Sequence, residues 1–466
     1  MTTFSWIAAV FSLLAPLDTP GHSAPAIQAP RAATPPAPRD ALDNLVAAVG
    51  LRAIDEDGVP GLTIAVAKDG GLLTCRGFGF AGADRATADT RWPIGSFAHP
   101  ITAVAVMRLV ESGKLGLEDD LAQLLPEFPV KPKDVTLRHL LTNTSGVPGW
   151  RKLQAKHPEV ETGKLGGKEF LALYADVPFD FEPGTAYSLD NTGYVLLGMI
   201  VTRASGEALA EHLKKHVTGP IGMTNTDVCP VESRPVGYAE DCKEIVDDRD
   251  LQVALPDSPY AGNQALCSTA SDLALWMHAL CDENAFGEAT TEALTKSAVT
   301  ADGKPTGASF AMTVGRLGES RWYVHAGGVG GFRLRAAHYD DIDTTVVVLA
   351  NCASAQVDEI EREIAGYLLG LPYPNQRGLP LSAADAAAFV GTYQIATTRV
   401  RIASTGGKLF FEWPTGAPVE LRYRGAFAFT LVGESESKLV FPGEGSKAAS
   451  FELTRGGTIT TGRRME

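Results

Sequence analysis

Residues 94–109 constrain this chain most, because a glycine step, a serine and a long apolar run follow one another there. Ser96 comes directly after an Ile-Gly step, and residues 101–109 have the composition of a buried helix. A spacing of three residues places Ser96 and His99 on one helical face, so their side chains can touch. A helix N-terminus also supplies the positive potential that a developing oxyanion needs. The segment predicts either a nucleophilic Ser96 with His99 as its base, or a plain helix cap at Ser96.

Four further segments combine small, polar and apolar residues in a fixed order. They are LLTNTSGVP at 140–148, PGTAYSLDNTGY at 183–194, STASDL at 268–273 and HAGG at 325–328. Together with Ser96, these segments resemble the serine β-lactamases, the penicillin-binding proteins and their esterase and peptidase relatives. The resemblance covers residues 41–370. It implies an acyl-enzyme on Ser96 and catalysis that requires neither a metal ion nor a cofactor.

Two positions depart from the pattern of that family. Its first motif reads Ser-x-x-Lys, and here His99 stands in the place of the lysine. Its second motif reads Tyr-x-Asn, which here is Leu189, Asp190 and Asn191, so a leucine replaces the tyrosine that carries protons. Asn191 keeps the ability to contact a substrate carbonyl. Alternatively, Asn191 caps the helix that begins there.

The third motif of the family is matched by HAG at residues 325–327. The resemblance implies that His325 sets the local potential, or binds a substrate carboxylate when protonated. It also implies an oxyanion hole made by the backbone N–H groups of Ser96 and Gly328. The alternative for His325 is a half-buried histidine at a strand end. The expected catalytic residues are Ser96, His99, Asn191 and His325.

Histidine is a suitable base electronically, since its ordinary pKa is about 6.5, whereas lysine must be lowered from about 10.4. The imidazole of His99 is shorter than a lysine side chain, and a proline follows it, which a first helical turn tolerates. Asp190 could orient His99 as in a triad. Two functions remain open: a hydrolase of small esters, amides or peptides, or an inactive family member that binds a cell-wall peptide, a small ligand or a protein in its cleft. Strong β-lactamase activity is not expected.

The order of predicted elements indicates an α+β domain over residues 41–375, an antiparallel sheet with a helical cluster like that of β-lactamases and transpeptidases. Helices are expected from residue 40, from 135, at 191–204 and from 269. Strands are expected at 62–67, 72–80, 322–325, 332–338 and 344–350.

A second, all-β domain is expected over residues 376–466. Short alternating strands are separated by turns, several of them rich in glycine, which is typical of a small barrel or sandwich. These strands are expected at 400–403, 408–413, 419–423, 427–432, 438–441 and 451–454.

The N-terminal residues resemble an export signal. Residues 4–15 form an apolar run of signal-peptide length that is too short to span a bilayer, although no basic residue precedes it. Residues 24–26 offer a small-x-small cleavage site. We therefore expect a signal peptide at 1–26, a Pro-rich linker at 27–40, and a periplasmic or extracellular protein without a stable membrane span.

Charge and cysteine content limit the partners. The net charge of −14 argues against nucleic acid and anionic membranes as partners, and instead for a soluble, freely diffusing protein. The family resemblance implies a small ester, amide or peptide as substrate. The six cysteines lack the Cys-x-x-Cys spacing of a zinc or redox site. In an exported chain, Cys229 with Cys242, or Cys267 with Cys281, are the expected disulfides, and buried unpaired thiols are the alternative.

Overall fold

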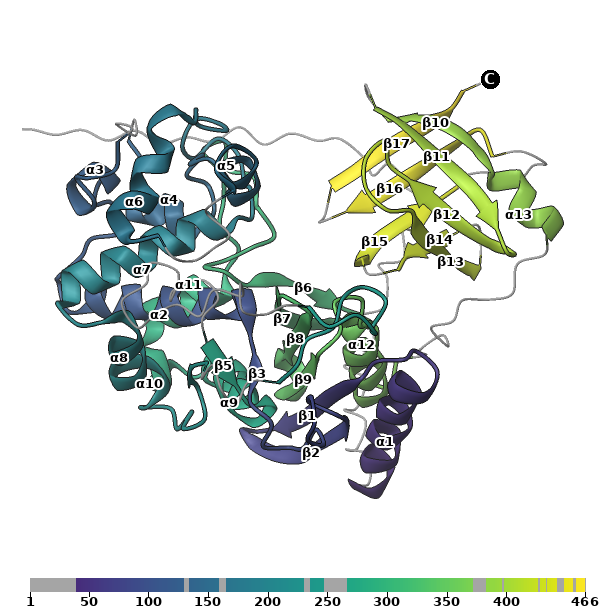
Figure 1. Ribbon diagram of the computed structural model, residues 1–466, viewed down its shortest axis with the longest axis horizontal. Coiled ribbons are helices and arrows are strands. Elements are labelled where there is room, and N and C mark those ends of the chain that lie inside the picture. The colour runs from purple at the N-terminus through teal and green to yellow at the C-terminus, as the bar shows by residue number, and fades with distance from the viewer. Residues whose placement is uncertain are drawn as a thin grey trace, which may run out of the picture. The chain divides into compact units, whose positions relative to one another are not determined.

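The computed structural model describes residues 39–129, 134–158, 165–229, 235–246, 266–371, 383–395, 398–425, 428–432, 434–441, 448–455 and 458–465. The expected signal peptide and nearly all of the expected linker lie outside these ranges. Within them, the chain forms an α+β structure followed by an all-β barrel, which confirms the predicted fold class (Figure 1). None of the helices in these ranges is long and apolar enough to cross a membrane.

An antiparallel sheet with the strand order β2-β1-β9-β8-β7-β6 lies at the centre of residues 39–371. Its strands are β1 (Gly61–Lys68), β2 (Gly71–Gly79), β6 (Thr313–Leu317), β7 (Ser320–Val329), β8 (Phe332–Tyr339) and β9 (Thr344–Ala350). The predicted strands are confirmed, and β6 is an addition. Strands β1 and β9 are neighbours although they are far apart in sequence, so the sheet joins the two ends of this domain.

Both faces of this sheet are covered by helices. Leu62, Ile64 and Val66 of β1 belong to a core with α1 (Arg39–Asp55) and α12 (Val357–Leu368). The alternate residues Ala65 and Ala67 face a second core, which includes α9 (Ala270–Ala279). Successive side chains of a strand point to opposite faces, so a strand that is apolar at every position is buried on both sides.

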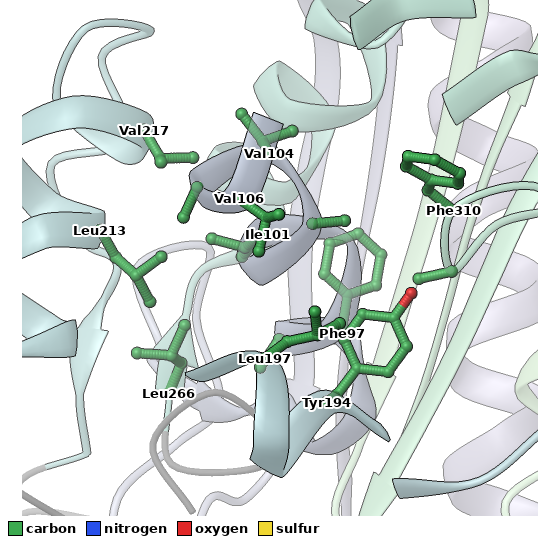
Figure 2. Close-up of a cluster of buried hydrophobic side chains, with 14 of the residues drawn as sticks. Phe97, Ile101, Val104, Val106, Tyr194, Leu197, Leu213, Val217, Leu266 and Phe310 are labelled. Atoms are coloured by element: carbon green, nitrogen blue, oxygen red, sulfur yellow. The ribbon is translucent and has the colours of Figure 1, made fainter. Parts of the chain in front are cut away.

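The second core lies in a cluster of helices. Besides α9, these are α2 (Ala98–Glu111), α3 (Leu121–Leu124), α4 (Leu137–Leu141), α5 (Trp150–Lys156), α6 (Gly167–Ala172), α7 (Asn191–Ser205), α8 (Leu209–Leu213), α10 (Glu283–Phe286) and α11 (Glu288–Thr295). Figure 2 shows part of the cluster, with Ile101 and Val104 of α2 close to Leu213 and Val217. Because α2 is enclosed by other helices, its sequence has no polar stripe.

A small sheet leads into the Ser96 segment. Strand β3 (Trp92–Pro93) pairs with β5 (Leu266–Ser268), which also pairs with β4 (Asp227–Val228). The pairing of β4 with β5 places Cys229 beside Cys267, and these two residues form a disulfide with a Cα–Cα distance of 4.8 Å.

Both expected disulfide pairings are therefore wrong. Cys242 is bonded to Cys352 across 110 residues, while Cys75 and Cys281 remain thiols. The expected pairs were close in sequence, whereas the observed pairs are set by neighbouring segments of the fold. The backbones of Tyr238 and Cys352 form an isolated β-bridge, and this pairing brings Cys242 close enough to Cys352 for a disulfide.

The C-terminal residues form a closed barrel, which decides between the two predicted all-β forms. Its strands follow one another in sequence order: β10 (Gly391–Ile395), β11 (Thr398–Thr405), β12 (Lys408–Glu412), β13 (Val419–Gly425), β14 (Ala428–Leu431), β15 (Glu434–Val440), β16 (Ser450–Arg455) and β17 (Thr458–Arg464). Helix α13 (Ala383–Phe389) precedes them. The interior holds Phe411, Phe429 and Phe451, so the barrel has a packed core of its own.

A buried ion pair joins α12 to β8 and should contribute measurably to the free energy of unfolding. Glu361 of α12 is fully buried and accepts hydrogen bonds from Arg335 Nε at 2.8 Å and from the Tyr339 hydroxyl at 2.5 Å. We expect Glu361→Ala to lower the free energy of unfolding by about 3–5 kcal/mol, because it leaves a buried guanidinium without its nearest anion. Urea unfolding at pH 7 measures this change.

Glu363→Ala on the same helix is the matched control. Glu363 pairs with Arg52 at a partly exposed site, where loss of an ion pair costs about 1 kcal/mol or less. Equal losses in the two variants would contradict a special role for the buried pair.

Candidate active site

Ser96 lies where the small sheet ends and helix α2 begins. The Ile94 N–H donates to the Leu266 carbonyl at 3.0 Å, and the chain then turns through Gly95, whose φ is +50°. Residues Gly95–Phe97 form one 3₁₀ turn that continues into α2. The N-cap position of α2 is Phe97, and no side chain caps the helix there. Ser96 is therefore not the helix cap that the sequence left open as an alternative.

The backbone around Ser96 packs tightly against strand β7. A Cβ atom on Gly95 would lie 2.7 Å from the Gly328 carbonyl oxygen, and one on Gly327 would lie 2.4 Å from the Ile94 carbonyl oxygen. Glycine is required at both positions because any side chain would push the two segments apart. The close packing holds Ser96 next to Gly328, the second expected donor of the oxyanion hole.

This packing makes Gly95→Ala an informative substitution. We expect the new methyl group to displace Ser96 from Gly328 and to reduce any hydrolytic rate by about 10²-fold, the usual cost of losing one oxyanion donor. Gly113→Ala is the matched control, since Gly113 ends the same helix with a φ of +72° but has open space around it. Steady-state rates of both variants test the idea. A loss of similar size in Gly113→Ala would point to backbone strain alone.

Asn191 is the residue that contacts Ser96. The Ser96 Oγ donates to Asn191 Oδ1 at 3.4 Å, from the first residue of α7. The cap of α7 is instead Asp190, whose Oδ1 accepts from the Thr192 N–H at 2.8 Å. Asn191 is thus not used as a cap, and one carboxylate oxygen of Asp190 serves the helix backbone. This hydrogen bond gives Asp190 a capping role, and the orientation of His99 by Asp190 stays a prediction.

His99, on the first turn of α2, is only 1% exposed. Its ring stacks on Tyr194 with a centroid distance of 4.3 Å and an interplanar angle of 13°. The Tyr194 hydroxyl donates to the Leu141 carbonyl at 2.9 Å, which fixes the phenol ring in place. Figure 2 shows Tyr194 on α7 in the same buried cluster as Phe97.

Tyr194 is a residue of the site that was not among the expected ones, although it follows Asn191 by three residues. That spacing puts both side chains on one face of α7 and was the signal available in the sequence. Asn191 faces Ser96 and Tyr194 faces His99, so α7 contacts both members of the expected pair.

His325 is a buried, neutral residue of β7. Its Nδ1 donates to the carbonyl of Ala311, a residue with the left-handed backbone φ of +64°. Burial lowers the pKa of His325 to about 4, although the carbonyls of Ala311 and Ser96 favour the protonated ring. His325 is therefore uncharged at pH 7, which argues against the expected binding of a carboxylate by its protonated form. Its ring centroid lies 5.9 Å from that of His99.

Leu189, at the position of the missing tyrosine, is 62% exposed and has no role in the core.

A separate cavity of about 610 Å³ is lined by Met107, His139, Thr144 and Phe310 among others, and by none of the four expected catalytic side chains. The chemistry is placed at Ser96 rather than in this cavity, because the Ser96 hydroxyl contacts Asn191 and lies beside the glycine backbone of β7.

Comparisons with known proteins show the relatives of this chain. The chain is 26% identical to Penicillin-binding protein 4* of Bacillus subtilis (strain 168), in a match that covers 75% of this chain and 83% of the relative. It is 25% identical to D-aminopeptidase of Gluconobacter oxydans (strain 621H), over 75% of this chain and 66% of the relative.

The solved structure of an octameric penicillin-binding protein homologue from Pyrococcus abyssi has the same fold. It superposes with a TM-score of 0.63 at 21% identity, and covers 91% of this chain and 99% of that chain. The model of the beta-lactamase family matches residues 39–369, which is most of the chain. By this match, the chain belongs to the beta-lactamase family.

Proposed function

We propose that this protein is a serine hydrolase that cleaves small esters, amides or peptides through an acyl-Ser96 intermediate. The observation that carries the proposal is the position of the Ser96 hydroxyl, which contacts Asn191 and lies beside the glycine backbone of β7. A relative named as a D-aminopeptidase supports an amide or peptide substrate.

In the proposed reaction, Ser96 Oγ attacks the substrate carbonyl carbon and its proton passes to His99. The N–H groups of Ser96 and Gly328 stabilise the oxyanion, and Asn191 orients the substrate. Collapse of this intermediate expels the leaving group, which takes the proton from His99. A water molecule then attacks the acyl-Ser96 ester, with His99 again accepting and returning the proton. His325 acts as a neutral neighbour of this site.

We also propose that the mature protein is exported, with the domain boundaries expected from the sequence. The two disulfides support export, since such bonds persist in oxidising compartments. The family domain is assigned to residues 41–375 and the barrel domain to residues 376–466.

One observation favours a second candidate function, binding without turnover. Leu189 presents an exposed apolar side chain where the family carries a proton-transferring tyrosine. An inactive member of this kind would hold a cell-wall peptide, a small ligand or a protein in its cleft.

The pH dependence of hydrolysis tests the assignment of the base. We expect kcat/KM for p-nitrophenyl acetate to fall on acidification, because protonated His99 cannot accept the serine proton. Burial lowers the pKa of His325 to about 4, so a decline centred at a higher pH cannot come from His325. A flat profile between about pH 4 and pH 8 would exclude His99 as the base.

A further inference from the structure

Two groups of side chains among the described residues combine histidine with other metal-ligand types. In the first, Glu207 faces His212 and His216, but Lys215 Nζ already lies 2.7 Å from the carboxylate of Glu207. An ammonium group in that position competes with a metal ion, so this group is satisfied as an ion network. The second group is Cys281, His338 and Asp340, and no lysine contacts it among the ion pairs of the described residues.

The second group is assembled from two parts of the family domain, outside the proposed active site. Cys281 follows the end of α9, His338 lies near the end of β8, and Asp340 begins the turn between β8 and β9. Their ligand atoms all lie within 4.8 Å of one another. Asp343 of the same turn adds a further carboxylate, with its Oδ1 3.8 Å from His338 Nε2.

His338 is oriented as metal-binding histidines are. It is 1% exposed, and its Nδ1 lies 3.0 Å from the Thr345 hydroxyl, which leaves Nε2 for the ligand group. In metal sites, a hydrogen bond to the ring nitrogen that does not bind the metal fixes the ring and its tautomer. His278 Nδ1 lies 3.1 Å from Asp343 Oδ1, so that carboxylate also has an outer partner.

Cys281 has no evident role as a nucleophile or in a disulfide. It remains a thiol in a chain that forms two disulfides. Cys281 is partly buried, and the carboxylates of Asp340 and Asp343 lie close enough to interact electrostatically with its sulfur. A cation would relieve the crowding of a sulfur and two carboxylates.

We propose that Cys281, His338 and Asp340 bind a Zn²⁺ ion, with Asp343 as the nearest fourth ligand. Thiolate, imidazole and carboxylate are the donors that zinc takes in tetrahedral sites. On binding, the Cys281 Sγ–H bond breaks, the sulfur bonds to zinc and the proton passes to solvent. Arg321, whose Nη1 lies 4.0 Å from Asp340 Oδ2, is half exposed and can turn away into water.

The consequence would be structural. The ion would tie the β8–β9 turn to the end of α9, and β8 pairs with β7, the strand that carries His325 and Gly328. Zinc should therefore stabilise the folded protein without taking part in hydrolysis. Because only the folded chain brings these ligands together, a hundredfold excess of zinc over its Kd should raise the Tm by about 5 °C.

Cobalt substitution tests the site directly. We expect the chelator-treated full chain to bind one equivalent of Co²⁺ and to develop a thiolate-to-cobalt charge-transfer absorption, together with the visible bands of tetrahedral cobalt. Added Zn²⁺ should remove both features. Cys281→Ser should lose the charge-transfer absorption, whereas Cys75→Ser, which changes the other free thiol, should keep it.

Two more variants keep the result interpretable. Asp340→Asn changes an exposed ligand that the fold does not need, and should weaken cobalt binding by about tenfold or more. His216→Ala changes the first group and should have no effect. Absence of the charge-transfer absorption in the native chain, or its persistence in Cys281→Ser, would overturn the proposal. Tight binding that His216→Ala removes would overturn it as well and would assign the metal to Glu207, His212 and His216.

Discussion

Ser96→Ala is expected to reduce the hydrolysis of p-nitrophenyl esters by about 10³-fold or more, to the level of the reaction without nucleophilic catalysis. The serine hydroxyl is the attacking group, and no neighbouring side chain in the described part of the site replaces it. Asn191, which contacts the Ser96 hydroxyl, has no nucleophilic atom. Initial rates of the purified variant and the native chain measure the loss.

Ser112→Ala is the matched control for this substitution. Ser112 lies at the other end of α2, where its hydroxyl bonds to the Leu109 carbonyl at 3.0 Å. Its rate should equal that of the native chain. If the native chain and Ser96→Ala both hydrolyse the ester at background rates, the binding function replaces the catalytic one, and ligands of the cleft become the question. The intact mass after incubation with the ester gives a second readout, since only an acylated Ser96 adds the acyl mass.

Much of the fold could be predicted because its signals are local. The alternation of β1 between two cores makes residues 64–67 continuously apolar, and such a run is visible in a single sequence. Strands β10 and β17 of the barrel were missed. The sequence of β17 is polar, and it is a strand because β10 needs a partner that closes the barrel. Whether β17 forms a strand therefore depends on residues about seventy positions earlier in the chain, and a local sequence pattern does not contain that information.

The site was predictable to the extent that its residues follow motifs. The segments containing Ser96, Asn191 and His325 were identified from the family resemblance, and in the structure Asn191 and His325 each interact with Ser96. The burial of His325, which keeps it neutral, depends on packing from Ala311 and Phe97 and has no local signal. The predicted disulfide pairings were wrong for the same reason. The sulfur atoms are brought together by neighbouring strands of a sheet and not by closeness in sequence.

The double variant His99→Lys with Leu189→Tyr is expected to increase kcat/KM for ester hydrolysis by about 10²-fold over the native chain, a typical contribution of positioned acid–base groups. His99 is nearly fully buried, so a lysine there would lose hydration, and its pKa would fall toward the range in which it can accept the serine proton. Leu189 is exposed, so a phenol fits at that position without overpacking.

Each substitution alone should give less than the pair, since groups of one catalytic unit do not act additively. Loss of the ring stack on Tyr194 can lower stability, so the Tm of each variant is measured beside its rate. The triple variant that also carries Ser96→Ala shows whether any gained rate passes through the serine. A folded double variant without a gain would mean that the cleft, and not only its proton transfer, differs from that of the active relatives. Ser96, Asn191 and the glycines of β7 would then form a binding site, because their geometry is independent of the base.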